Sequence, residues 1–216
     1  MNKFLTKSME KIFNTLGSNL DEFKDKTILI TGANGLIGGF LSEFFMYLND
    51  EHDFNSKLVL TSLSDDPKRL GNLIYRKDVQ YYSRDLTNDS WFFDEIDFCI
   101  YCAGYAQPNK FLSDAEKTYQ LNVDAMVRTF QSVMFERKKS KMLFISSSEV
   151  YALNDITKPH CETDELKLDL WHKRAPYIIG KVTGEYNVGL LREKGYNVKS
   201  ARVSLCYGPG HVMEDT

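Results

Sequence analysis

Four residues in the second half of the chain carry side chains that could transfer protons. Tyr177 and Lys181 stand four residues apart in the segment YIIGK, so on a helix their side chains share one face. An ammonium group near a phenol favours the phenolate, so Tyr177 could act as a base near neutral pH. Ser147 and Glu149 lie in FISSSEVY, directly after the apolar run KMLFI. Because burying unpaired polar groups is costly, such a strand end either caps a turn or delivers polar atoms to a site.

A glycine-rich segment, TGANGLIGG, lies between an apolar run at 26–31 and a helical pattern at 36–48. Tight turns also use glycine for structural reasons, but a position after the first strand of an alternating pattern favours dinucleotide binding. We expect the first glycine to permit the turn, the second to let backbone approach a pyrophosphate, and the third to allow close helix packing. The helix would then present free N–H groups to the phosphates. The predicted cofactor contacts here are Gly32, Asn34, Gly35, Leu36, Ile37 and Gly38.

Apolar runs alternate with helical patterns along the rest of the chain. This alternation predicts an α/β fold, a doubly wound parallel sheet (Rossmann fold) with right-handed crossovers and helices on both faces. The first 25 residues carry apolar residues at helical spacing and predict a helical extension. We expect it to pack on its own fold rather than on a membrane surface. The predicted units are an extension at 1–25 and one domain at 26–216, with strands at 26–31, 57–62, 79–85, 96–104, 141–146 and 197–208 and later helices at 115–139 and 177–195.

Composition excludes several classes of function. A net charge of −3 over 216 residues argues against a bulk electrostatic nucleic-acid binder. No apolar run approaches the ~18–20 residues that span a bilayer, and the N-terminus lacks a signal-peptide core. Cys99 and Cys102 form C-x-x-C inside a predicted strand, where they would point to opposite faces as buried core residues rather than form a redox pair. We expect a cytoplasmic protein with no metal site and no nucleic-acid or membrane partner.

Seven motifs occur in an order that resembles the extended short-chain dehydrogenase/reductase family, the nucleotide-sugar epimerases, dehydratases and decarboxylases. The resemblance covers about 26–210, nearly the whole chain. Each motif alone is common, whereas the ordered set is specific. The motifs are TGANGLIG, RDLT after the third strand, YCAG after the fourth, LNV, SSSEVYA, YIIGK and ARVSLCYGPG.

The resemblance implies roles for individual residues. Ser147 occupies the family's catalytic Ser/Thr position and would hydrogen-bond the 4-hydroxyl of a sugar, while Tyr177 removes that proton and C4 passes hydride to the nicotinamide. Lys181 would hold the nicotinamide ribose and depress the pKa of Tyr177. Asp85 matches the acid that contacts the adenine. The predicted cofactor contacts beyond the glycine turn are Thr61, Asp85, Leu86, Ala103, Gly104, Asn122, Tyr177 and Lys181.

The reaction that follows C4 oxidation depends on Glu149 and its neighbour Ser148. By resemblance, a 4,6-dehydratase carries Asp-Glu after its Thr, whereas a C6 decarboxylase resembles the Ser-Glu found here. Glu149 could instead only cap the following turn. We expect a nucleotide-sugar enzyme with tightly bound NAD(P), either UDP-glucuronate decarboxylase-like or a 4-epimerase. The alternatives are a 4,6-dehydratase and a non-catalytic dinucleotide-binding regulator or scaffold on the same fold.

The cofactor is expected to be NAD, and NADP is not excluded. NAD binders usually place an acid at the end of the second strand to hold the ribose hydroxyls. Here that strand ends in Thr61 and Ser62, and two acids, Asp65 and Asp66, follow slightly late. Arg69 could meet a 2′-phosphate, or it could be an ordinary surface arginine. The sequence therefore leaves the choice between the two dinucleotides open.

The chain departs from the family pattern at three places. The position three residues after Arg202, usually an Asn that contacts substrate, is Leu205. The residue before Lys181, commonly Ser, is Gly180. Family members continue for another hundred or so residues after YGPG, whereas this chain ends at Thr216. We therefore expect the part that forms most of the nucleotide-sugar pocket to be missing, which would leave cofactor binding without turnover.

Apolar residues cover more than one face of the predicted helices at 115–139 and 177–195, which contain Asn122 and Tyr177. A helix that is apolar beyond one stripe must bury its second face. Because a sheet covers only one side, we expect these helices to pair with their copies in a two-fold symmetric homodimer. The resemblance also implies a dimer, since family members commonly dimerise through these two helices. The alternative is that the N-terminal helix or a C-terminal segment covers this surface within one chain.

Overall fold

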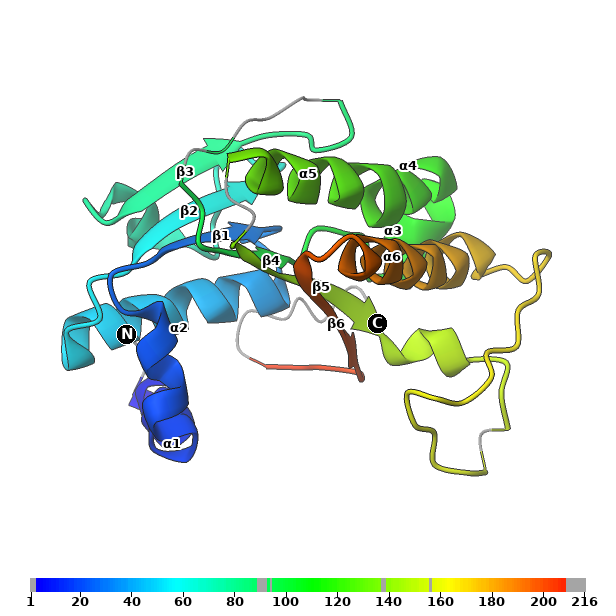
Figure 1. The fold of residues 1–216 in the computed structure, drawn as a ribbon, viewed down its shortest axis with the longest axis horizontal. Helices are drawn as coiled ribbons and strands as arrows, with labels where there is room; N and C mark the ends of the chain where they lie inside the picture. The colour runs from blue at the N-terminus through cyan, green and yellow to red at the C-terminus, as the bar shows by residue number, and fades with distance from the viewer. Residues whose placement is uncertain (1–2, 89–92, 94, 137–138, 156, 209–216) are drawn as a thin grey trace.

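A parallel sheet of six strands forms the centre of the computed structural model, which describes residues 3–88, 93, 95–136, 139–155 and 157–208 (Figure 1). The strand order is β3-β2-β1-β4-β5-β6, and every neighbouring pair is parallel. The order reverses between β1 and β4, which is the place where doubly wound sheets bind ligands. The predicted fold class is thus confirmed. The strands are β1 Thr27–Thr31, β2 Lys57–Ser62, β3 Val79–Ser83, β4 Phe98–Tyr101, β5 Lys141–Ser147 and β6 Asn197–Val203.

Helices cover both faces of this sheet (Figure 1). One face carries α1 Lys3–Leu16, the 3-10 helix η1 Gly17–Phe23 and α2 Leu36–His52. The other face carries α3 Pro108–Ser113, α4 Ala115–Gln120, the π-helical turn η3 Leu121–Ala125, α5 Met126–Glu136 and α6 Ala175–Glu193. Two short 3-10 helices, η2 Gly71–Tyr75 and η4 Ser148–Tyr151, follow β2 and β5. The predicted helix at 115–139 is therefore interrupted by a π-turn.

Alternate residues of the strands enter two separate cores. Ile28 and Ile30 of β1 pack with α2, whereas Leu29 packs with α5 and α6, because successive side chains of a strand point to opposite faces. Cys99 and Cys102 divide between the same two cores, as expected. Burial raises the pKa of Cys102 to about 12 and that of Cys99 further. Cys99 is therefore a core residue and Cys102 lies at the edge of the other core, and neither thiol ionises readily as a redox cysteine would.

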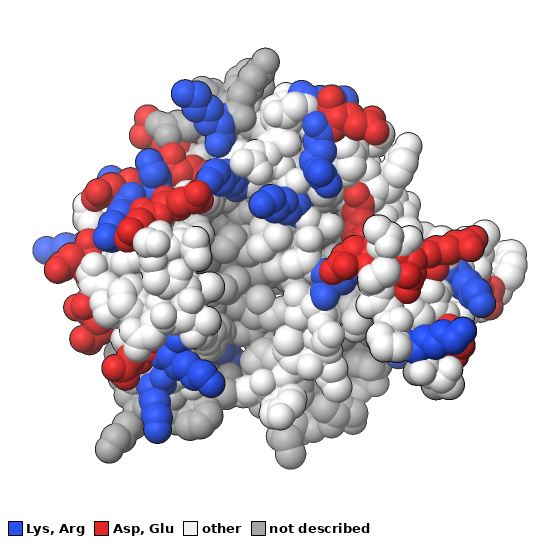
Figure 2. Space-filling model, turned by 60° about the horizontal axis from the view of Figure 1, so that its bottom comes forward, with Lys and Arg blue, Asp and Glu red and all other residues white. Residues whose placement is uncertain are grey.

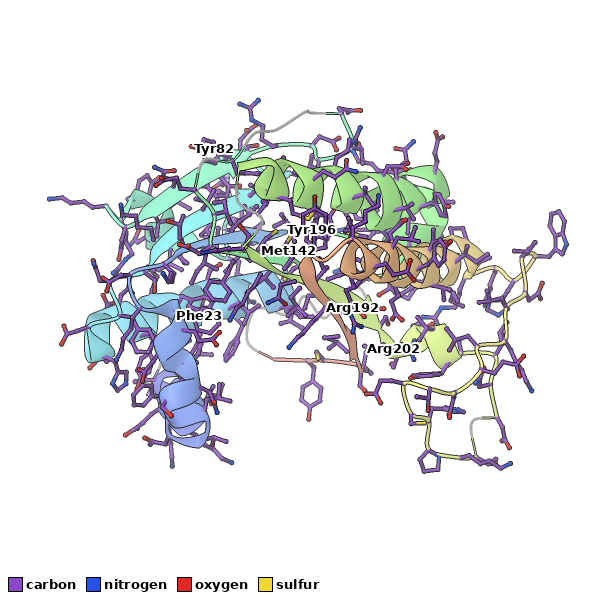
Figure 3. All side chains as sticks on the ribbon, in the orientation of Figure 1. Phe23, Tyr82, Met142, Arg192, Tyr196 and Arg202 are labelled. Carbon is purple, nitrogen blue, oxygen red and sulfur yellow. The ribbon has the colours of Figure 1, made fainter. Side chains whose placement is uncertain are left out.

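The N-terminal extension packs on the α2 face of its own chain. Met9 is completely buried, and the Phe13 ring stacks on His52 with centroids 3.5 Å apart. Phe23, labelled in Figure 3, lies 5.1 Å from Phe45 between ring centroids. These contacts explain the apolar periodicity of the segment without a membrane. Among the described residues, no helix is both long enough and apolar enough to cross a membrane.

The apolar residues of α5 are buried within their own chain, which corrects the reason given for a dimer. Met126, Phe130, Val133 and Met134 are all at most 5% exposed, and they belong to the core between α5 and the sheet. Their apolar character is therefore satisfied without a second copy. On α6, Tyr186 is 65% exposed and stands outside that core.

Candidate active site

The glycine turn connects β1 to α2 at the point where the strand order reverses. Gly32 has a φ of +63°, in the left-handed region that glycine adopts without strain. A Cβ at Gly32 would lie 2.9 Å from backbone atoms of Ala103, and one at Gly38 would lie 2.5 Å from the Gly32 carbonyl oxygen. Within the turn, the Gly35 N–H donates to the Gly32 carbonyl at 2.9 Å. The turn thus requires glycine at both ends for packing reasons alone.

A cavity of about 180 Å³ opens beside this turn, at the carboxyl ends of the central strands. We call it the first cavity. Seven of the predicted cofactor residues line it, namely Gly32, Gly35, Thr61, Asp85, Leu86, Ala103 and Gly104. The other seven do not, namely Asn34, Leu36, Ile37, Gly38, Asn122, Tyr177 and Lys181. The rest of the lining was not predicted from the sequence and consists of Ser62, Leu63, Arg84, Cys102, Tyr105, Lys117 and Leu121.

Two residues near the glycine turn take other contacts. The Asn34 side-chain oxygen accepts from the Arg69 backbone N–H at 3.1 Å, which ties the turn to the loop after β2. Arg69, considered above for a 2′-phosphate, runs along α2, because a Cβ on Gly39 would lie 1.9 Å from its Nε. The Arg69 side chain is therefore packed on the helix surface.

Asp85 has a full set of hydrogen-bond donors. Its Oδ1 accepts from the backbone N–H and the hydroxyl of Thr87, at 3.0 and 2.7 Å. Its Oδ2 accepts from Lys117 Nζ at 2.6 Å and from Asn88 at 3.3 Å. Partial burial opposes ionisation, but the bonds from Lys117 and Thr87 prevail and lower the pKa of Asp85. A carboxylate accepts about four hydrogen bonds, so an adenine amine could bond Asp85 only by displacing a present donor.

Lys117 therefore joins the end of β3 to α4 across the first cavity. Sequence reasoning missed it, although a signal was present. Lys117 and Leu121 stand four residues apart just before Asn122, and on a helix that spacing places both on one face.

Asn122 is completely buried in the π-turn η3. Its side-chain amide donates to the Thr118 carbonyl at 2.8 Å, whereas its Oδ1 is buried without a hydrogen-bond partner among the described residues. A Cβ at Gly104 would lie 3.4 Å from this Oδ1, and one at Gly180 would lie 3.2 Å from the Asn122 Cβ. Close packing on Asn122 thus accounts for glycine where the family commonly has Ser.

The serines at the end of β5 separate into different roles. The Ser146 hydroxyl donates to Glu185 of α6, so this residue fixes the helix on the sheet. The Ser147 oxygen accepts from the Glu149 backbone N–H at 3.2 Å and caps η4. The same Ser147 side chain lies close enough to the Tyr177 phenol to lower its pKa. The strand end therefore both caps a turn and delivers a hydroxyl to the predicted base.

Lys181 is 6% exposed, and its ammonium donates to the Ile145 carbonyl at 2.7 Å. It lies 5.7 Å from the centroid of the Tyr177 ring. Burial lowers the pKa of Lys181 to about 8 and raises the pKa of Tyr177, against the opposing effect of Ser147. The expected depression of the Tyr177 pKa is therefore not seen in the cofactor-free chain, because burial outweighs the groups that lower it. Lys181 donates to the backbone and not to the phenol. Ser147, Tyr177 and Lys181 nevertheless lie together.

The buried lysine predicts an unusual pH dependence of stability. The Lys181 pKa is about 8 in the folded chain against an ordinary 10.5, so between these values the unfolded chain binds more protons there and the free energy of unfolding rises with pH. Lys181→Met should therefore be more stabilising near neutral pH than at about pH 9.5. Urea unfolding of both proteins across this range measures the difference. Lys199→Met, at an exposed lysine, is the control; a Lys181→Met effect independent of pH would contradict the assignment.

A second cavity, of about 430 Å³, lies beyond the end of β5. Its lining residues are Ser148, Glu149, Tyr151, Ala152, Lys158, His160, Glu162, Arg202 and Ser204. Glu149 forms an ion pair with Arg174 at 3.0 Å, next to the start of α6. Sequence reasoning missed Arg174, because nothing in the spacing of these residues places them side by side.

Arg202 of β6 is held by Glu185 of α6 through contacts of 2.7 to 3.0 Å, and it also bonds the Tyr151 hydroxyl. Figure 3 shows Arg202 beside η4. Leu205, where the family usually has Asn, is 94% exposed. Ser204 lines the second cavity instead.

The first cavity and its surroundings fit a dinucleotide. Gly32 and Gly35 of the glycine turn line the cavity, so backbone without side chains faces it there. Two predicted cofactor residues, Thr61 and Asn122, hold buried oxygens that have no partner among the described residues. Acidic and basic side chains are interspersed on the face that Figure 2 shows, around a central hollow. Within the described part of the chain, no group of His, Cys, Asp and Glu residues could hold a metal ion.

The strand order, the glycine turn at the switch point and the cavity beside it define a dinucleotide-binding protein of the doubly wound α/β class. The chain belongs to the NAD dependent epimerase/dehydratase family, which matches residues 28–216. The resemblance drawn from the motifs is thereby confirmed, and with it membership of a family of NAD-dependent enzymes.

The chain is similar to several known proteins. It is 24% identical over 199 residues to UDP-glucuronic acid decarboxylase 1 of Xenopus tropicalis, covering 91% of the chain and 45% of the relative. The Bordetella bronchiseptica enzyme WbmF in complex with NAD+ superposes with a TM-score of 0.67 at 17% identity, over 90% and 54% of the two chains. UDP-glucuronic acid 4-epimerase of Bacillus cereus in complex with NAD gives 0.63 at 21%, over 86% and 59%. The chain thus spans about half the length of these proteins.

Proposed function

We propose that this protein oxidises a nucleotide sugar at C4 with tightly bound NAD(P), and that residues 26–216 bind the dinucleotide. The observation that carries the proposal is the meeting of Ser147, Tyr177 and Lys181 at the end of β5. A binding module or scaffold has no need of a buried hydroxyl, phenol and ammonium in one place.

The free state of all four cysteines supports a cytoplasmic location.

Each of the three residues has a distinct part in this proposal. The glycine turn, Thr61 and Asn122 would hold the dinucleotide, which supplies the hydride acceptor when bound. Ser147 orients the sugar 4-hydroxyl, and Tyr177 removes its proton. In the cofactor-free protein the pKa of Tyr177 is raised by burial, so the base requires a nearby positive charge to work near neutral pH. The Arg174 guanidinium lowers the pKa of Tyr177 in this way, and in this proposal Lys181, about one helical turn away, adds a second positive charge.

The reaction after oxidation is proposed to be decarboxylation or 4-epimerisation. A dehydratase needs a base for the C5 proton, and Glu149 is the residue at that position. Its carboxylate is paired with Arg174 at 3.0 Å and is therefore already engaged in an ion pair. A 4-epimerase only oxidises C4 and reduces it again, and a decarboxylase loses the C6 carboxylate. Neither reaction needs a base for the C5 proton.

Product analysis tests the proposal and separates the alternatives. The full-length protein is incubated with NAD+ or NADP+ and, in turn, UDP-glucuronate, UDP-glucose and dTDP-glucose, and the products are identified by mass spectrometry and NMR. A UDP-pentose or the C4 epimer of UDP-glucuronate is expected. A 4-keto-6-deoxy sugar would show dehydration instead. Recovery of every sugar unchanged, although the dinucleotide binds, would favour a regulator or scaffold.

We also propose a homodimer through α4 and α6, because both helices carry large apolar side chains that are exposed. Tyr186 and Leu190 stand four residues apart on α6 and are 65% and 36% exposed, and Tyr119 of α4 is 37% exposed. Tyr186→Glu would place a charge in the interface and should convert the dimer to a monomer, as measured by light scattering at micromolar concentration. Tyr75→Glu, at an 80% exposed position on the other side of the sheet, is the control. A parent protein that is monomeric would refute the proposal.

A further inference from the structure

The second cavity differs from the first in chemistry. Hydroxyl, carboxylate, amine, guanidinium and imidazole groups line it, and Ala152 contributes an apolar side chain. Its lining includes Ser148 and Glu149, which follow Ser147 directly in the chain. A cavity so rich in donors and acceptors suits a ligand with many hydroxyl groups rather than a flat aromatic ring. Its lining thus begins one residue beyond Ser147.

His160 is held in this cavity by two neighbours. Its Nδ1 lies 3.1 Å from Asp164 Oδ2, and its ring stacks on Tyr151 at 5.1 Å between centroids with an interplanar angle of 14°. Asp164 is itself fixed, because it accepts from the backbone N–H and the thiol of Cys161 at 3.1 and 2.9 Å. Both the position and the plane of the imidazole are thereby determined.

The other ring nitrogen has no hydrogen-bond partner. The bonds from Cys161 and His160 lower the pKa of Asp164, so it is a carboxylate that only accepts. The Nδ1 of His160 must therefore donate to it, and in the neutral ring Nε2 is then an acceptor. Nε2 is shielded from bulk solvent, and among the described residues none bonds it. Such unpaired buried polar atoms are rare, and each calls for an explanation.

A structural role alone explains only half of this arrangement. Asp164 could simply fix the loop between η4 and α6 through Cys161, with His160 as a further anchor. That role requires Nδ1 and the face of the ring, whereas it leaves Nε2 buried and unpaired, which costs free energy. A ligand hydroxyl that displaces the atoms covering Nε2 and bonds it would remove this cost.

We propose that His160, oriented by Asp164, is a positioning residue that accepts a hydrogen bond from a hydroxyl of the sugar in the second cavity. This inference rests on the proposed function and adds a residue to which the family resemblance assigns no role. His160 holds the sugar against Ser147 and Tyr177 and takes no proton in the reaction.

The test compares four variants of the full-length protein with UDP-glucuronate as the probe. They are His160→Ala, His160→Gln, Asp164→Asn and, as a control that removes the same charge from the same loop, Asp169→Asn. Michaelis constants and turnover are measured with saturating NAD+, and NAD+ affinity is measured separately by calorimetry. His160→Ala should raise KM about 10-fold, the equivalent of one hydrogen bond, with a smaller change in kcat. NAD+ affinity should not change.

The conservative variant separates positioning from loop structure. The amide of Gln reaches about as far as Nε2, so His160→Gln should restore most of the KM, and Asp164→Asn should fall between parent and His160→Ala. Asp169→Asn should match the parent. Unchanged KM in His160→Ala, or equal losses in the Ala and Gln variants together with weaker NAD+ binding, would overturn the inference and leave the proposed function intact. A parent protein that neither binds nor converts UDP-sugars would overturn both.

Discussion

Replacing Tyr177 by Phe is expected to lower turnover of the nucleotide sugar by ~10²-fold or more, because the variant keeps the ring and loses the proton acceptor. Tyr177 is 6% exposed, its ring stacks on Phe111 at 5.0 Å between centroids, and the neighbouring Ser147 side chain acts to lower its pKa. The aromatic packing survives the substitution, so the fold should be retained. Steady-state kinetics with UDP-glucuronate measures the loss.

Tyr186→Phe provides the matched control for this variant. It removes a hydroxyl from the same helix at a position that is 65% exposed, and it should leave turnover unchanged. A Tyr177→Phe protein whose turnover and pH profile equal those of the parent would show that another group removes the proton.

Replacing Gly35 by Val should weaken NAD(P) binding by ~10-fold or more, a loss of at least about 1.4 kcal/mol. Gly35 precedes α2 and lies at the exposed middle of the turn, and it lines the first cavity. A Cβ at this position meets only the Gly32 carbonyl oxygen, at 3.1 Å. The turn can therefore accept the side chain with a small shift, whereas a pyrophosphate brought close to this backbone cannot.

The control must separate loss of binding from loss of folding. Gly189→Val adds the same side chain on α6 where nothing lies within 4 Å, and it should bind the dinucleotide like the parent. Calorimetric titration with NAD+ and NADP+ gives both affinities. If a folded Gly35→Val protein binds NAD+ and NADP+ as tightly as the parent, the dinucleotide does not bind at this turn.

The sheet could be predicted from the sequence because its central strands β1, β2 and β4 are mostly buried. Runs such as ILI in β1 and MLFI in β5 are continuously apolar and stand between helical patterns, which is typical of parallel strands. The helix at 115–139 was predicted as one element because hydrophobic spacing alone does not reveal the π-turn at Leu121–Ala125. The apolar residues of α5 suggested a partner molecule. The sequence does not show that these residues pack in one core with the strands and α6.

The candidate site was predictable where family motifs mark it and not elsewhere. Ser147, Tyr177 and Lys181 lie in short motifs, and the structure brings them together. Arg174, Lys117 and His160 lie outside those motifs, and the partners of Arg174 and Lys117 are distant in the sequence, so tertiary folding brings them together. His160 in particular joins Asp164 and Tyr151 through a loop of irregular structure, for which periodicity has no signal.

Transfer of deuterium from C4 of a labelled sugar tests the central claim most directly. The full-length protein is mixed with NAD+ and UDP-glucuronate that carries deuterium at C4, and the bound dinucleotide is recovered at short times for mass spectrometry. We predict deuterium in the dinucleotide for the parent protein and little for Tyr177→Phe. A dinucleotide that binds beside Gly32 yet stays unlabelled with UDP-glucuronate, and likewise with C4-deuterated UDP-glucose and dTDP-glucose, would contradict C4 oxidation by this site.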